Sequence, residues 1–292
     1  MKLIKGFEVN IATNNSVLNT SENMFNNKKK LDGNIEKLAT GLKVNKASDN
    51  ASGLAIADKL RTQVSSIGQS VENAMSGVML TQIADKAMSE QSNILDVIKE
   101  KLIQANTSTT SQEGRINITK DIVKLMDQLD EIAATTNYNG TYLLQQDRDD
   151  QSSSSELEFQ VGELESNTID LEDSLVQANS IGYDLVDLKN ADVDNGMTRE
   201  FAASQMEKID EALTTANSFR SNFAAIHNQL KSATRTLNVS LVNMSGAESV
   251  IRDLDYASES AEFTKNNIIN QSGSFAMSQS KEAHNKAMDL VA

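Results

Sequence analysis

The amino-acid sequence predicts a mainly α-helical protein, an elongated antiparallel coiled-coil helical bundle with a small β-hairpin region. From Ile209 to Leu254 an apolar residue recurs at alternating steps of three and four, interrupted only by Ser240. Such a seam must stay buried against partner helices, and at 1.5 Å per residue it would run for roughly 70 Å. The chain contains no Pro, the main helix breaker. Its aromatic content of 4% argues against a thick globular core.

The first expected helix lies within residues 7–42. It is rich in Asn, a poor helix former, and therefore needs a partner helix for stability. Its apolar residues show heptad-like spacing and are expected to form one side of a terminal coiled coil: Val17, Met24, Leu31, Ile35, Leu38 and Leu42.

Residues 41–53 are rich in turn and cap residues, including Gly41, Asp49 and Gly53. They predict an extended connector that ends where a new helix begins. Ser48 is the candidate N-cap of that helix, with Asp49 in its first turn, where an acid suits the positive end of the helix dipole.

Three further helices are expected to pack as an antiparallel bundle that we call the rod. The first continues to Leu102 with a phase drift near residue 80, the second contains Ile118 to Ile132, and the third is the seam of 209–254. The predicted rod seam consists of Leu60, Val64, Ile67, Val71, Ile122, Leu125, Leu129, Phe219, Phe223, Ile226, Leu230 and Leu237.

The middle of the chain predicts β structure. Asn139-Gly140 is a strong type I′ turn signal. Residues 157–161 alternate apolar and polar side chains, as in a half-buried strand, and 168–172 form a second candidate strand. The polar, Ser-rich segment 145–156 and residues 189–196 are expected to be loops.

After Leu254 the seam weakens, and Asn residues again dilute the helix propensity. Both ends of the chain are therefore amphipathic and marginal alone, so we expect the terminal helices to pair as a coiled coil, to contact other copies, and to order on assembly. The apolar residues of this last helix are Ala261, Ile268, Phe275, Ala283, Ala287 and Leu290.

Charge and chemistry exclude several function classes. The net charge of −14 argues against a nucleic-acid partner and disfavours an anionic membrane. No apolar run approaches the 18 or so residues of a membrane span. The chain has two His, no Cys and no metal or catalytic motif. We therefore expect no enzyme activity, cofactor or metal.

Two motifs at opposite ends of the chain carry a family resemblance. Ala47-Ser-Asp-Asn-Ala-Ser-Gly-Leu-Ala-Ile-Ala-Asp-Lys-Leu-Arg61, preceded by Leu38 to Asn45, closely resembles the N-terminal signature of bacterial flagellins. Ile251-Arg-Asp-Leu-Asp-Tyr-Ala-Ser-Glu259, with Ile268 to Gly273, resembles their C-terminal signature. The resemblance covers about residues 7–145 and 197–290.

This resemblance implies a subunit that polymerises into the extracellular flagellar filament. It divides the chain into a filament-core helix and connector (1–48), two halves of the rod (49–145 and 197–255), a short hairpin and loop region without a large outer domain (146–196), and a C-terminal core helix (256–292). The implied partners are other copies, an export chaperone, the cap and hook-associated proteins. Export would use the flagellar apparatus without a cleaved signal peptide.

The resemblance also bears on host recognition. Many flagellins present a Leu-Gln-Arg-Val-Arg-Glu-Leu-type segment to a Toll-like receptor, and the matching residues here run from Leu95 to Lys101, including Glu100. Val97 and Lys99 replace the two Arg residues, and Lys cannot offer a bidentate guanidinium. We expect weak or absent activation of that receptor.

Some alternatives stay open at this stage. The tract Ser152, Ser153, Ser154 and Ser155 could carry O-linked sugars or be a plain solvated loop. The closest alternative function is a flagellin-like hook–filament junction protein, which shares the terminal coil but would not form long filaments. A secreted adhesin or immune ligand is the alternative from another class.

Overall fold

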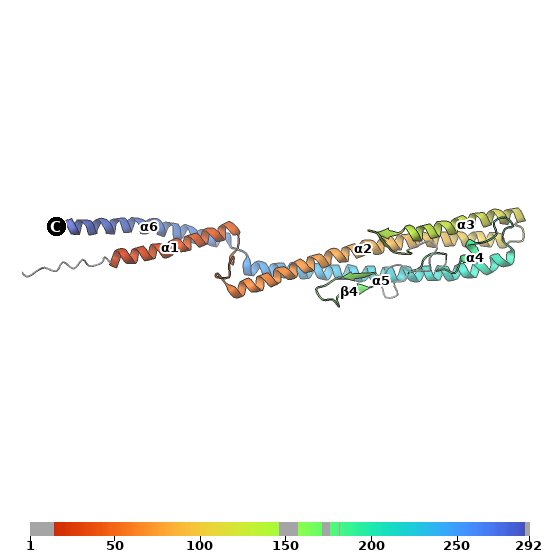
Figure 1. Ribbon diagram of the computed structural model, residues 1–292, viewed down its shortest axis with the longest axis horizontal. Coiled ribbons are helices and arrows are strands. Elements are labelled where there is room, and N and C mark those ends of the chain that lie inside the picture. The colour runs from red at the N-terminus through yellow and green to blue at the C-terminus, as the bar shows by residue number, and fades with distance from the viewer. Residues whose placement is uncertain (1–14, 146–156, 171–175, 181, 290–292) are drawn as a thin grey trace, which may run out of the picture. The chain divides into compact units, whose positions relative to one another are not determined.

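The computed structural model describes residues 15–145, 157–170, 176–180 and 182–289. The chain divides into two compact units. Unit 1 comprises residues 1–62 with 244–292, and unit 2 comprises residues 63–243. Figure 1 labels the helices and strands that these units contain.

The described part of the chain contains long helices and short strands. The helices are α1 (Asn15–Thr40), α2 (Ala51–Asn106), α3 (Gln112–Thr135), α4 (Val186–Lys189), α5 (Arg199–Arg252) and α6 (Tyr256–Asp289). The strands are β1 (Asn137–Tyr138), β2 (Thr141–Tyr142), β3 (Glu158–Gln160) and β4 (Thr168–Asp170). The predicted mainly α fold with a small β region is confirmed.

In unit 1, α1 and α6 pack against each other as antiparallel helices. Asn27 contacts Asn266, whereas Lys37, further along α1, contacts Glu259, nearer the start of α6. On each helix a set of sheltered positions alternates at steps of three and four, the periodicity of a coiled coil. These positions are Val17, Thr20, Met24, Asn27, Leu31, Asn34 and Leu38 on α1, and Glu259, Phe263, Asn266, Asn270, Gly273, Met277 and Ser280 on α6.

In unit 2, α2 packs antiparallel to both α5 and α3. Thr81 contacts His227 and Lys99 pairs with Asp210 on α5, while Gln91 donates a hydrogen bond to the backbone carbonyl of Leu129 on α3. From Thr81 onward the buried positions of α2 again follow a 3–4 alternation. They are Thr81, Ala84, Met88, Gln91, Leu95, Ile98, Leu102 and Ala105, and Ile94 is buried beside them.

Both segments predicted to contain β structure form antiparallel hairpins. β1 pairs antiparallel with β2 through a turn in which Asn139 and Gly140 have φ values of 51° and 86°, so the predicted type I′ signal is confirmed. β3 pairs antiparallel with β4. The β3–β4 hairpin packs on the helices at Gly77, where an added Cβ would lie 2.9 Å from both Leu230 and Phe159.

A buried carboxylate holds the segment before α5 against α3. Asp130 is 1% exposed, and it accepts hydrogen bonds from the backbone N–H and the hydroxyl of Ser180 and from the Nζ of Lys189. Nearby, Gln91 bonds the carbonyl of Ala178, and burial raises the pKa of the Tyr183 hydroxyl. These bonds satisfy polar groups that would otherwise be costly to bury.

Candidate assembly site

The connector between α1 and α2 is bonded to the segment between α5 and α6. Lys43 N donates to the carbonyl of Arg252 at 2.7 Å, and Leu254 N donates to the carbonyl of Gly41 at 3.0 Å. These bonds form an isolated antiparallel bridge between Leu42 and Asp253. The two ends of the chain are therefore joined by backbone hydrogen bonds, which do not depend on side-chain identity.

Helix α1 ends at a glycine that α6 covers. Gly41 has a φ of +72°, and its N–H donates to the carbonyl of Lys37, which is the usual left-handed helix ending. The Tyr256 hydroxyl donates to the carbonyl of Leu38 at 2.8 Å. The start of α6 thus satisfies a backbone acceptor in the last turn of α1.

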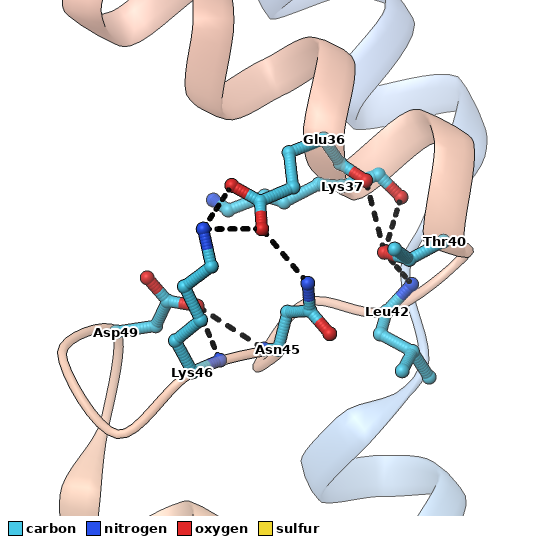
Figure 2. Close-up of polar contacts among 7 residues, drawn as sticks. All are labelled: Glu36, Lys37, Thr40, Leu42, Asn45, Lys46 and Asp49. Carbon is cyan, nitrogen blue, oxygen red and sulfur yellow. Dashed lines mark hydrogen bonds and ion pairs between the residues drawn. The ribbon is translucent and has the colours of Figure 1, made fainter.

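Figure 2 shows that charged side chains fold the connector back onto α1. Lys46 Nζ lies 2.6 Å from Glu36 Oε1, and Asn45 Nδ2 donates to the same oxygen at 2.9 Å. Asp49 accepts from the backbone N–H groups of Lys46 and Asn45 at 2.9 and 3.1 Å. The connector is therefore a turn in which the backbone donors of Asn45 and Lys46 are satisfied by Asp49.

These contacts shift the pKa values of the three charged groups. The hydrogen bonds from Lys46 and Asn45 lower the pKa of Glu36. The backbone N–H groups of Lys46 and Asn45 lower the pKa of Asp49. The Glu36 carboxylate in turn raises the pKa of Lys46. Each shift favours the charged form.

The expectation that Ser48 caps the next helix is wrong. Helix α2 begins at Ala51, and Asn50 caps it, because its Oδ1 accepts from Gly53 N at 2.9 Å. The Asp49 carboxylate is directed at the connector instead of the first turn of the helix. Because Asp49 takes part in the connector turn, the helix begins two residues later than an N-cap at Ser48 would place it.

The seam between α1 and α6 is unusually polar. Asn27, Asn34 and Asn266 are 8%, 7% and 3% exposed. Asn27 Nδ2 donates to the carbonyl of Asn266 at 2.8 Å, and Lys37 lies 3.8 Å from Glu259. Polar residues at single seam positions fix the register of a coiled coil at some loss of stability.

Other apolar side chains lie on the solvent-exposed faces of the two helices. Phe25 is 70% exposed and Phe275 is 74% exposed. We use the name terminal apolar faces for six exposed residues: Leu18, Phe25 and Ile35 on α1, and Ile268, Ile269 and Phe275 on α6. Large apolar side chains that are this exposed are candidates for contact with another molecule.

The predicted terminal assembly residues fall into two groups. Half-buried in unit 1 are Val17, Met24, Leu31, Leu38 and Leu42. Ile35, Ile268 and Phe275 are exposed. Ala283 lies within α6 and its side chain is not described, while Leu290 lies outside the described residues. Asn27, Asn34 and Asn266 were not among the predicted residues. Each follows another seam residue by seven positions (Thr20, Asn27 and Glu259, respectively), and this heptad spacing could have indicated that they lie in the seam.

The predicted rod-seam residues are all sheltered to some degree. Fully buried are Ile122, Leu129, Phe223, Ile226 and Leu230. Half-buried are Leu60, Val64, Ile67, Val71, Leu125, Phe219 and Leu237.

In the segment matched to receptor recognition, Leu95 is buried in the helical core. Val97 is 42% exposed and Glu100 is exposed. Lys99 forms an ion pair with Asp210 of α5. Ser152, Ser153, Ser154 and Ser155 lie outside the described residues.

Among the described residues, no group of three or more His, Cys, Asp or Glu could hold a metal ion. None of the described helices is long and apolar enough to cross a membrane.

Paired terminal helices with a polar seam and exposed apolar faces define a coiled-coil structural protein suited to self-association. The N-terminal helical region of bacterial flagellin matches residues 11–149, and the C-terminal helical region matches residues 206–290. The chain belongs to the bacterial flagellin family.

Similar proteins agree with this assignment. The flagellin of Bacillus subtilis (strain 168) is 31% identical over 306 residues, which cover 96% of this chain and 99% of that protein. The flagellar filament 33 kDa core protein of Treponema phagedenis is 28% identical, with the same coverage. A solved structure of a putative flagellar hook-associated protein from Vibrio parahaemolyticus has a TM-score of 0.56 at 11% identity, and covers 70% of this chain and 99% of that one. That last similarity concerns the fold alone.

Proposed function

We propose that this chain is a structural subunit that polymerises into the bacterial flagellar filament by burying its terminal apolar faces against other copies. Membership of the flagellin family supports the filament, and the exposure of Phe25 and Phe275 supports the surface. The polar seam between α1 and α6 sets their alignment, which leaves the apolar faces available to neighbouring subunits.

The size of the apolar faces is consistent with this role. Fully burying one large apolar side chain contributes roughly 1.5–3 kcal/mol. Association and ordering cost about 4–15 kcal/mol. A single side chain cannot offset that cost, whereas the six residues of the terminal apolar faces can. Assembly should therefore require both terminal helices together.

Electron microscopy of purified chain after seeding or salt-induced polymerisation tests this proposal. The intact chain should form long filaments, and a chain lacking residues 1–40 should not. A Phe25→Ser/Phe275→Ser variant should also fail, whereas Val97→Ser, an equally apolar-to-polar change on α2, should polymerise. If the intact chain forms only short stubs, the hook–filament junction alternative replaces the proposal.

The domain boundaries and partners are proposed on the same basis. Residues 1–48 and 256–292 would form the filament core, and 49–145 with 197–255 the rod. The export chaperone, the cap and the hook-associated proteins would bind in addition to other copies. Export would use the flagellar apparatus without a cleaved signal peptide.

We also propose weak or absent activation of the host Toll-like receptor. Val97 lacks the positive charge of the matching Arg, and Lys99 is already engaged with Asp210. A reporter-cell response equal to that of a flagellin with both Arg residues would refute this proposal. A Val97→Arg/Lys99→Arg variant should increase the response.

A further inference from the structure

A groove with an apolar floor and a basic rim lies between α2 and α5 in unit 2. Met75, Val78 and Met79 of α2 form the floor, and His227, Lys231 and Arg235 of α5 line the other side. Its volume is about 320 Å³. Met75 and Met79 are 47% and 51% exposed, so the floor is open to a ligand.

The rim of this groove carries unpaired positive charge. No acidic side chain in the described ranges lies within ion-pair distance of Lys231 or Arg235. The chain as a whole carries a net charge of −14, so this basic rim differs in sign from the chain's overall charge. The fitting ligand would place an apolar side chain on the floor and carboxylates on the rim.

The tip of the β3–β4 hairpin has this chemistry. Leu164 is 64% exposed, and it stands between Glu163 and Glu165, both exposed. Hydrogen bonds brace the tip, because Gln160 Nε2 donates to the carbonyls of Gly162 and Leu164 at 2.8 and 2.6 Å. A preformed loop loses little conformational entropy on binding.

The tip cannot occupy the groove of its own chain. The hairpin packs on the side of α2 that carries Asn73 and Gly77, through the carbonyl of Gln160 and the ring of Phe159. Met75 and Met79 each lie two residues from Gly77, which is about 200° around the helix. Groove and hairpin are therefore on opposite sides of α2, and Figure 1 shows the hairpin along one side of the α2–α5 pair.

We propose that the groove receives the Glu163-Leu164-Glu165 tip of a second copy of this chain. The two surfaces lie on opposite sides of the same unit, so the contact is heterologous and repeats from one subunit to the next. It places opposite charges together between subunits that would otherwise repel one another electrostatically, because each carries a net negative charge. The inference rests on the proposed polymerisation, and it assigns which outer surfaces meet.

Cross-linking tests the contact directly, because the chain has no Cys and introduced thiols are unique. Filaments are assembled from a mixture of Leu164→Cys and Met79→Cys chains and treated with a short bifunctional thiol reagent. Covalent dimers should form only in the mixture. A mixture of Leu164→Cys with Ile103→Cys, exposed on the same helix, is the matched control and should give none.

Charge exchange gives an independent test. Lys231→Glu/Arg235→Glu should raise the protein concentration needed for polymerisation by roughly threefold to tenfold. Glu163→Lys/Glu165→Lys should have a similar effect, and combining the four changes in one chain should restore the original concentration. Lys120→Glu/Lys124→Glu on α3 is the matched control for net charge and should leave it nearly unchanged. Circular dichroism establishes that each variant is folded.

The outcomes separate this inference from the proposed function. If filaments form but the mixed thiols do not cross-link, or if the four changes add instead of cancelling, the groove–tip contact is wrong and the filament proposal stands. If the unmodified chain forms no filaments, the proposed function itself fails.

Discussion

Asn27 and Asn266 are 239 residues apart in the sequence and share a buried hydrogen bond of 2.8 Å between the Asn27 amide and the Asn266 carbonyl. This bond lies at the seam of α1 and α6, where a coiled coil ordinarily places apolar side chains. The chain thus pairs its terminal helices by a specific polar contact and leaves Phe25 and Phe275 exposed for other contacts.

Asn27→Ala should weaken the terminal helix pair by about 1 kcal/mol, because it removes one buried hydrogen bond. The measurement is hydrogen exchange of the α6 amides around residue 266, which should become faster. Asn26→Ala, an exposed neighbour of the same type, is the control and should leave exchange unchanged. Equal effects from both variants would mean that helix propensity, not the hydrogen bond, matters.

Gly41→Ala and Gly33→Ala should act in opposite directions. Gly41 has a φ of +72°, which costs a non-Gly residue about 1–2 kcal/mol. Gly33 lies inside α1 with nothing within 4 Å of an added Cβ, so Ala should stabilise the helix by up to about 1 kcal/mol. Hydrogen exchange of the α1 amides measures both changes. A stabilising Gly41→Ala would contradict the described helix ending.

The charged contacts of the connector should persist over a broad pH range and weaken in acid. A carboxyl whose pKa is lowered by folding contributes stability above its unfolded pKa, and this contribution is lost as pH falls through the folded value. For Glu36 and Asp49 the loss begins below their ordinary values of 4.5 and 3.8. For Lys46, whose pKa is raised, the contribution is complete below 10.5 and is lost above it.

The amide chemical shifts of Asn45 and Lys46, followed by NMR against pH, measure this window. In a Glu36→Gln variant, the change in these chemical shifts on acidification should become smaller, because only the protonation of Asp49 then contributes to it. An unaltered titration in that variant would show that the bonds from Lys46 and Asn45 to Glu36 do not hold the connector.

Asp130→Ala should destabilise unit 2 by about 3 kcal/mol, because it removes the carboxylate that satisfies Ser180 and Lys189 in a buried setting. The midpoint of urea unfolding by circular dichroism gives the change. Asp127→Ala, at an exposed position on the same helix, should shift the midpoint little. If both variants shifted the urea midpoint equally, the effect would come from the loss of a negative charge on α3 and not from the buried contacts of Asp130.

The sequence could predict the helices of the rod because the seam from Ile209 onward is long and regular. It also predicted the hairpin at Asn139-Gly140, since few residue pairs tolerate positive φ at both positions. It misplaced the start of α2, because Ser48 and Asn50 are both good caps. Only the hydrogen bonds that Asp49 accepts from the backbone N–H groups of Asn45 and Lys46 decided between them.

The sequence by itself determined that both ends of the chain form amphipathic helices that need a partner, because periodicity and composition are local properties. It could not decide which face of α6 meets α1. Ala261, Ile268 and Phe275 repeat every seven residues, and so do Glu259, Asn266 and Gly273. The tertiary structure chose the second set, because hydrogen bonds such as that of Asn27 with Asn266 form only when two specific helices align.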